Sequence, residues 1–134
     1  MEARLFPEGT TPEWTTPEWY EGRETAPHLE QEGHRDRLLL SAEFADEAIH
    51  RGARNVVDLG AGDGGLLSVL QDHVIDDVYG FDLQQTNVDA ADGRGVRVLL
   101  RDAVADGRWA ENITPPTLLI ATEMLEHLVD PHAF

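Results

Sequence analysis

A glycine-rich turn directly after a short apolar strand is the feature that most constrains what this chain can fold into. The stretch Val56-Val57-Asp58-Leu59 runs into Gly60-Ala61-Gly62-Asp63-Gly64-Gly65 and then into a helical pattern. Glycines at such a turn adopt backbone conformations that other residues avoid, and they let a ligand approach the main chain closely. The stretch therefore predicts a strand, a binding loop and a helix, which together form the first unit of an α/β fold.

Four short apolar runs follow one another from residue 56 onward, at 56–57, 78–81, 96–100 and 118–120. Helical patterns at 65–71 and 84–91 separate the first three runs, and a less regular connection, 102–116, leads to the fourth. Strands that alternate with helices predict a parallel sheet, and right-handed crossovers would place helices on both of its faces.

The part before the first strand predicts an N-terminal arm and an amphipathic helix over residues 1–54, distinct from a ligand-binding domain over 55–134. Thr16 is suited to cap a short helix over 17–24. A longer helix is expected from about 34 to 51, where apolar residues recur at helical spacing and Gly52 offers a C-cap. Two roles remain open for the arm's aromatic residues, docking the arm or covering a ligand; they are Trp14, Trp19 and Tyr20.

The net charge and the amino-acid composition exclude or disfavour several kinds of partner and site. A formal net charge of -16, from 26 acidic residues against ten basic ones, repels phosphates, so nucleic acid is a disfavoured substrate. The sequence contains no cysteine, which excludes disulfides and thiolate metal sites. No run reaches the roughly 18 apolar residues of a membrane span, and no signal-peptide pattern opens the chain. A cytoplasmic protein without a membrane partner is expected.

Acidic residues stand where the first two strands end. The glycine spacing also satisfies the dinucleotide pattern G-x-G-x-x-G, but a carboxylate at Asp58 would oppose a pyrophosphate there. Asp58 suits a ligand that carries an ammonium and a sulfonium, as S-adenosylmethionine does. Asp82 follows the glycines by about 20 residues, where an acid can accept hydrogen bonds from ribose hydroxyls. Its alternative role is a helix N-cap, and Leu83 beside it could pack against adenine.

A third acid follows the third strand. Asp102 could accept from an adenine amino group, with the Ala103 N–H facing a ring nitrogen, and the alternative is a turn-forming Asp. The fourth strand leads into Glu123-Met-Leu-Glu-His-Leu. This polar segment lies at the carboxyl end of a strand, where open α/β sheets bind ligands.

Taken together, these motifs resemble the class I, Rossmann-like, S-adenosylmethionine-dependent methyltransferases of the small-molecule type. The resemblance covers about residues 55 to 134 and implies a parallel sheet of strand order 3-2-1-4, with the later strands of the family absent. It implies a methyltransferase that uses S-adenosylmethionine on a small-molecule acceptor. The cofactor-binding residues that it implies are Asp58, Gly60, Ala61 and Gly62 for the methionine half, Asp82 for the ribose, Leu83, Asp102 and Ala103 for adenine, and Glu123 on the side facing substrate. Gly64 and Gly65 are expected to serve helix packing instead.

Three residues of the last motif also resemble the metal ligands of RNA 3′-end 2′-O-methyltransferases: Glu123, Glu126 and His127. That family's further histidine lies well downstream, so no metal site is expected here. Glu123 and His127 are the nearest candidates for a general base by position, but neither is assigned, and the catalytic residues stay unknown.

Three explanations are open for the missing strands: a fragment of a longer enzyme, a subunit completed by another chain, or a non-catalytic S-adenosylmethionine-binding module. A nicotinamide oxidoreductase is a weaker alternative. Residues 117–121 read as an apolar strand without a charge to discourage pairing. Self-association, or pairing with a completing chain, is therefore expected at the fourth strand.

Overall fold

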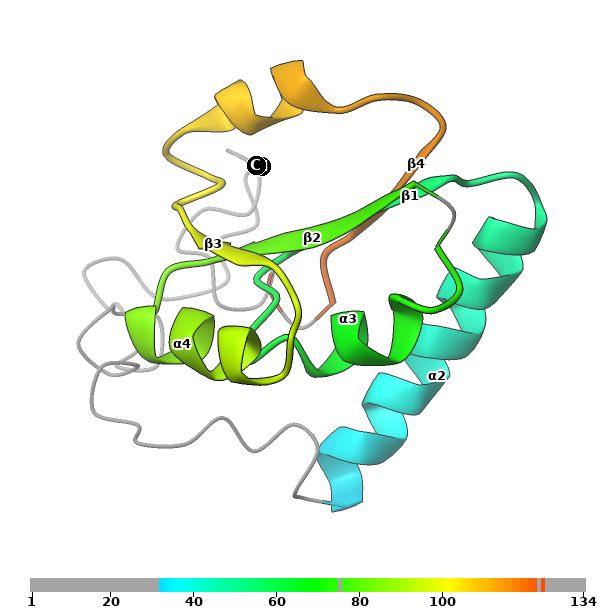
Figure 1. Cartoon of the computed structure of the whole chain (residues 1–134), viewed down its shortest axis with the longest axis horizontal. Helices are drawn as coiled ribbons and strands as arrows, with labels where there is room; N and C mark the ends of the chain where they lie inside the picture. Colours follow the sequence, from blue (N-terminus) through cyan, green and yellow to red (C-terminus); the bar gives the residue numbers. More distant parts are fainter. Residues whose placement is uncertain (1–31, 75, 123, 125–134) are drawn as a thin grey trace, which may run out of the picture.

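A computed structural model describes residues 32–74, 76–122 and 124 of the chain. The predicted helix over 17–24, the aromatic residues of the arm, and Glu123, Glu126 and His127 lie outside the described residues. The elements in chain order are α2 (Glu32–His50), β1 (Asn55–Leu59), α3 (Gly65–Leu70), β2 (Asp77–Asp82), α4 (Gln85–Gly93), β3 (Val98–Leu100), the 3₁₀ helix η2 (Gly107–Asn112) and β4 (Thr117–Ile120) (Figure 1).

The four strands form one parallel sheet in the order β3-β2-β1-β4, which confirms the expected order 3-2-1-4. In its register Val57 lies between Tyr79 of β2 and Leu119 of β4. All five residues of β1 are buried. A central parallel strand is covered on both faces, and this accounts for the uninterrupted apolar character that made β1 recognisable in the sequence.

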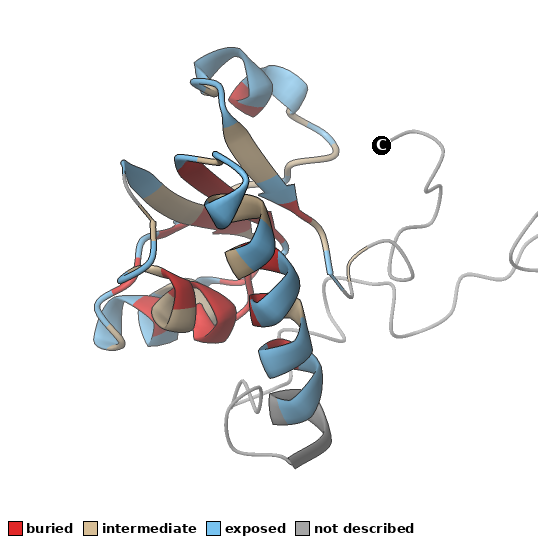
Figure 2. Ribbon diagram, turned by 90° about the vertical axis from the view of Figure 1, so that its right-hand side faces the viewer, coloured by how far each residue is buried: buried red, intermediate tan, exposed pale blue. Residues whose placement is uncertain are grey.

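Successive side chains of a strand point to opposite faces, and β1 shows this division. Val56 joins the larger core cluster, with residues of α2, α3 and α4, whereas Val57 and Leu59 join a second cluster with Phe81. The three α-helices lie on one side of the sheet, as Figure 1 shows, and buried residues gather between them and the strands in Figure 2. The expectation of helices on both faces is therefore met only in part.

The second face is covered by the connection between β3 and β4. Trp109 of η2 is 8% exposed, its ring centroid lies 6.1 Å from that of Phe81, and its Nε1 donates to the carbonyl of Ala103 at 2.8 Å. Trp109 packs with Val57, Leu59 and Phe81 in the second core cluster, and Ala103 and Ile113 of the same connection pack against that cluster. The sequence indicated only an irregular connection here, because a 3₁₀ turn of six residues leaves no periodicity to recognise.

Helix α2 follows the sequence expectation closely. Leu38, Ala42 and Ala45 turn toward the sheet and are buried. Beyond its last turn, Gly52 takes φ +116°, its N–H donates to the carbonyl of Ile49, and the Ala53 N–H donates to the carbonyl of Ala48, each at 3.0 Å. These two bonds form a Schellman motif, so Gly52 ends the helix as predicted.

No helix among the described residues is long and apolar enough to cross a membrane.

Candidate functional site

The loop between β1 and α3 has the glycine geometry that its sequence predicts. Gly60, Gly62 and Gly64 take φ values of +75°, +57° and +73°, in the left-handed region that favours glycine. The N–H groups of Gly60 and Ala61 both donate to the carbonyl of Phe81 at 2.9 Å. The loop is thus fastened to the neighbouring strand β2 while it reverses direction into α3.

Two glycines are required because other elements come too close for a side chain. A Cβ on Gly64 would lie 2.4 Å from Cγ2 of Val96 and 3.1 Å from Cβ of Ala91, which confirms the expected packing role. A Cβ on Gly80 would lie 2.5 Å from Cβ of Ala61. Sequence reasoning assigned nothing to Gly80, although a glycine inside a strand is a signal of close backbone approach.

Asp58 is the most unusual polar residue of the site. It is 3% exposed, and its Oδ1 is buried without a hydrogen-bond partner in the part of the chain that the structure describes. Burial, and secondarily the charge of Asp82, raise the pKa of Asp58 to about 8. A buried carboxyl without a cation favours its neutral form, and a cationic group brought beside it would favour the carboxylate.

Asp82 joins the glycine loop to the start of α4. Its Oδ2 accepts from the Gly62 N–H at 2.9 Å, and its Oδ1 accepts from the Gln84 N–H at 2.9 Å and from Nδ2 of Asn87 at 3.0 Å. The alternative role of Asp82 as a helix N-cap is wrong, because α4 begins at Gln85 and its N-cap is Gln84; Asp82 lies two residues before the cap and accepts from that residue's N–H. A carboxylate has about four lone-pair positions, so these three bonds leave capacity for a ligand hydroxyl. Its predicted role at a ribose remains a prediction.

The other described site residues, Leu83, Asp102 and Ala103, follow β2 and β3 at the same edge of the sheet, because the carboxyl ends of parallel strands meet there. Leu83 is 53% exposed, so its apolar side chain is open to a ligand. Oδ1 of Asp102 accepts from the N–H groups of Val104 and Ala105 at 2.9 Å, which is the turn-forming role considered as the alternative. Ala103 packs against the second core cluster. Contacts of Leu83, Asp102 and Ala103 with adenine remain predictions.

The structure bonds Gly62 directly to Asp82, and it bonds Gly60 and Ala61 to Phe81, the residue before Asp82. Asp58 is buried in β1, directly before this loop. The segment after β4 also reaches this loop, since a Cβ on Gly60 would lie 3.1 Å from Cγ of Met124. Glu123, the ninth predicted site residue, lies outside the described residues. Within the described ranges no group of three His, Asp or Glu side chains is arranged to hold a metal ion.

Sequence reasoning missed one ion pair at this loop. Asp63 is fully buried, its Oδ1 accepts from the Gly65 N–H at 3.1 Å, and its Oδ2 accepts from Nη2 of Arg94 at 2.8 Å. An acid inside a glycine loop was the available signal. Its partner stands 31 positions later along the chain, so no local pattern connects the two.

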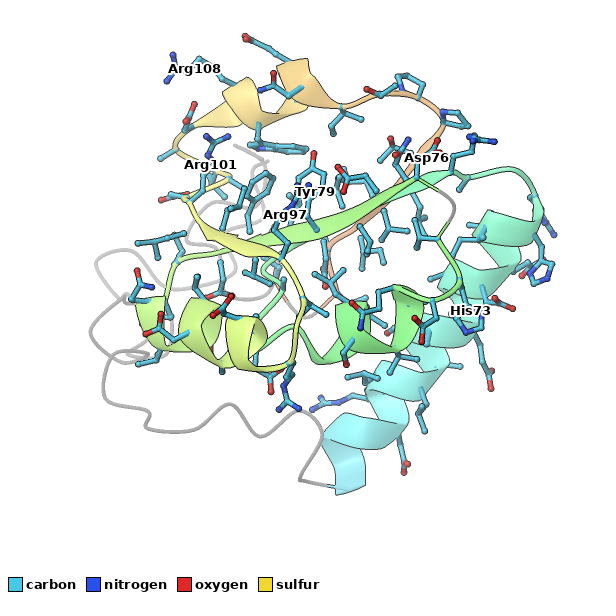
Figure 3. The ribbon with its side chains drawn as sticks, viewed as in Figure 1. His73, Asp76, Tyr79, Arg97, Arg101 and Arg108 are labelled. Atoms are coloured by element: carbon cyan, nitrogen blue, oxygen red, sulfur yellow. The ribbon has the colours of Figure 1, made fainter. Side chains whose placement is uncertain are left out.

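Other charged pairs lie at the amino ends of the strands, away from the glycine loop. Arg54, directly before β1, makes two hydrogen bonds to Asp76 at 2.8 and 2.9 Å. Arg97 pairs with Asp77 and lies 4.5 Å from the centre of the Tyr79 ring; Asp76, Tyr79 and Arg97 are labelled in Figure 3. These arginines are exposed and already paired, which separates them from the buried charges around the glycine loop.

Comparison with known proteins identifies the architecture. A family model described as a methyltransferase domain matches residues 26–134. The plantazolicin methyltransferase BpumL in complex with SAH superposes with a TM-score of 0.54 at 13% identity, over 78% of this chain and 47% of that one. BamL, a plantazolicin methyltransferase in complex with a triazolic desmethylPZN analog and SAH, gives 0.54 at 18% identity, over 75% and 39%.

A SAM-dependent methyltransferase from Archaeoglobus fulgidus is 23% identical over 68% of this chain and 42% of its own, with a TM-score of 0.47. The chain thus spans less than half the length of these three solved structures. At such identities the likeness to the two plantazolicin enzymes concerns the fold. A search of curated proteins found no match.

Proposed function

Because the chain belongs to the methyltransferase-domain family, we propose that it binds S-adenosylmethionine and takes part in methyl transfer to a small-molecule acceptor. The observation that carries the proposal is the buried carboxyl of Asp58, with one oxygen unpartnered among the described residues, beside a glycine loop. The ammonium and sulfonium of S-adenosylmethionine are cations of the kind that such a group would stabilise.

The charge around the loop also argues against a dinucleotide. Asp58 lies near the carboxyl end of β1, beside the loop, and a carboxylate there would oppose a pyrophosphate seated on the loop. We assign the methionine half of the cofactor to Asp58, Gly60, Ala61 and Gly62. Because the glycines have no side chain, the cofactor could approach the main chain of the loop closely.

The other half of the cofactor is assigned along the same sheet edge. Asp82 would accept from the ribose hydroxyls with its remaining lone-pair capacity, and the exposed face of Leu83 would lie against adenine. Asp102 and Ala103 would contact the adenine edge, and Glu123 the side facing the acceptor. Asp82 and Asp102 would keep their present backbone bonds in this arrangement, so the loops need no rearrangement to bind.

S-adenosylmethionine supplies an electrophilic methyl group on a good leaving group, and the protein's task is to align the acceptor with it and exclude water. The loop residues would hold the donor's methionine end by main-chain contacts and by the Asp58 carboxylate. No protein nucleophile is required. A general base serves only acceptors that are protonated at neutral pH, and no described residue is assigned that role.

Two observations support a small-molecule acceptor. The net charge of -16 works against a nucleic acid substrate, and the two neighbours with a TM-score of 0.54 are named as methyltransferases of plantazolicin. Binding of the donor and transfer of the methyl group are separate steps, so a non-catalytic S-adenosylmethionine-binding module is the alternative function. A cytoplasmic location remains part of the proposal.

Calorimetry with S-adenosylhomocysteine and with NAD tests the cofactor assignment. We expect S-adenosylhomocysteine to bind and NAD to bind much more weakly. Tighter binding of NAD would overturn the assignment and favour an oxidoreductase. A turnover assay with S-adenosylmethionine and a panel of small acceptors then separates an enzyme from a binding module.

A further inference from the structure

We propose that Arg94 is a positioning residue for the glycine loop, which it holds in its binding conformation through Asp63. The consequence for cofactor affinity rests on the proposed function, whereas the effect on the loop itself does not. Arg94 has no place in the sequence motifs of the site, and it stands at the opposite end of α4 from Asp82.

The contact between Asp63 and Arg94 links the glycine loop to the end of α4. Asp63 lies within the loop, and its carboxylate binds both the Gly65 N–H at the start of α3 and the Arg94 guanidinium. Arg94 is the C-cap residue of α4, with its own N–H donating to the carbonyls of Ala90 and Ala91. The side chain of Asp63 is 1% exposed and that of Arg94 29%, so water screens this pair far less than the pairs on the surface.

Helix α4 therefore holds the loop from both of its ends. At its start, Asp82 bonds Gly62 of the loop together with Gln84 and Asn87. At its end, Arg94 bonds Asp63, and the side chains of Ala91 and Val96 fill the space against Gly64. Two carboxylates, that of Asp82 at Gly62 and that of Asp63 at Arg94, thus tie the loop to the two ends of α4.

This arrangement has a consequence for binding. Three loop glycines have positive φ, and glycine has the widest range of alternative conformations. A loop of this kind loses conformational freedom when it binds a ligand unless it is already held in place. Arg94 restricts residues 63–65 before the cofactor arrives, so its removal should weaken binding even where the fold survives.

The test compares Arg94→Met, which keeps the length of the side chain without the charge, with Arg94→Lys and with the control Arg54→Met. Arg54 also pairs with an aspartate, Asp76, but at the other end of β1. Amide hydrogen exchange of the ligand-free protein reports on the loop, and calorimetry with S-adenosylhomocysteine reports on affinity.

For Arg94→Met we expect faster exchange at the Gly65 amide and roughly fivefold to tenfold weaker binding, with partial recovery in Arg94→Lys and no change in Arg54→Met. If Arg94→Met does not fold, Asp63→Asn replaces it, since the amide oxygen can still accept from Gly65. Unchanged loop exchange, or an equal loss of affinity in Arg54→Met, would overturn the inference. If wild-type protein does not bind S-adenosylhomocysteine, the proposed function would be overturned instead. The hydrogen-exchange data would still decide whether Arg94 holds the loop.

Discussion

Asp58 and Asp82 stand at the carboxyl ends of the two neighbouring parallel strands β1 and β2, and the charge of Asp82 adds to burial in disfavouring ionisation of Asp58. Asp58 is paired in register with Gly80, two residues before Asp82. Asp82 keeps hydrogen bonds from two N–H groups and an amide, whereas Oδ1 of Asp58 has no partner among the described residues. The two acids thus differ in environment, and they should differ in function.

Stability should depend on pH through Asp58. Its pKa rises from 3.8 to about 8 in the folded chain, so the folded state binds this proton more tightly than the unfolded state. The stabilisation is full below pH 4 and is lost as pH rises through 8. Asp58→Asn has no carboxyl to ionise, so it does not lose stability in this way. Its free energy of unfolding relative to that of wild type should therefore increase by roughly 1–3 kcal/mol between pH 5 and pH 8. Urea denaturation of both proteins at each pH measures this difference, and a difference that stays constant between pH 5 and pH 8 would contradict the prediction.

Asp82→Ala should weaken S-adenosylhomocysteine binding by about 1.5–3 kcal/mol, or roughly tenfold or more, because a hydrogen-bonding carboxylate is lost. The change also releases Gly62 from the start of α4. Calorimetry measures the affinity, and Asp89→Ala, at an exposed position of α4, is the control. Equal affinity for wild type and Asp82→Ala would remove Asp82 from the cofactor site.

Gly64→Ala should destabilise the protein by about 2–4 kcal/mol, since it combines a left-handed backbone with overpacking against Val96. Gly95→Ala is a matched control, because Gly95 has φ +75° but no atom within 4 Å of its would-be Cβ. It should cost only the backbone part, about 1–2 kcal/mol. Equal losses in the two variants, measured by denaturation, would show that the close contact with Val96 is unimportant.

Magnesium or manganese should leave the melting temperature of residues 1–134 unchanged, because Glu123, Glu126 and His127 resemble only three of the ligands that the metal-dependent family uses. A thermal shift titration with a chelator control measures this. Binding at a hundredfold excess over Kd would add about 2.7 kcal/mol of stability. A rise that disappears in Glu126→Ala would give the RNA-directed alternative priority.

Self-association should occur through β4, which lies at an edge of the described sheet. Leu119 is 45% exposed and Phe44 of α2 is 67% exposed, beside a groove of about 300 Å³ between α2 and β4. The net charge of -16 makes the chains repel one another at low salt. At physiological ionic strength the screening length is about 8 Å, so this repulsion weakens and self-association should become detectable. Light scattering across a salt series should show larger species for wild type than for Leu119→Lys. A stable monomer at high salt and high protein concentration would contradict the prediction.

Features that depend on local backbone conformation were predictable from the sequence. The loop glycines, the Gly52 cap and the buried run of β1 each follow from residue type and spacing within a few positions. The strand order was implied by the resemblance and is confirmed. Asp58 and Asp82 were also placed correctly at the ends of their strands, because a strand's end is visible where its apolar run stops.

Only the tertiary structure decided the contacts between distant segments. The pairing of Asp63 with Arg94, the demand for glycine at position 80 and the packing of Trp109 over Phe81 all join residues from separate elements. The position of α2, α3 and α4 on one face of the sheet belongs to the same class. Local pattern specifies φ, ψ and which side of an element is apolar, but the energy of a buried charge or a close contact depends on what the fold brings beside it.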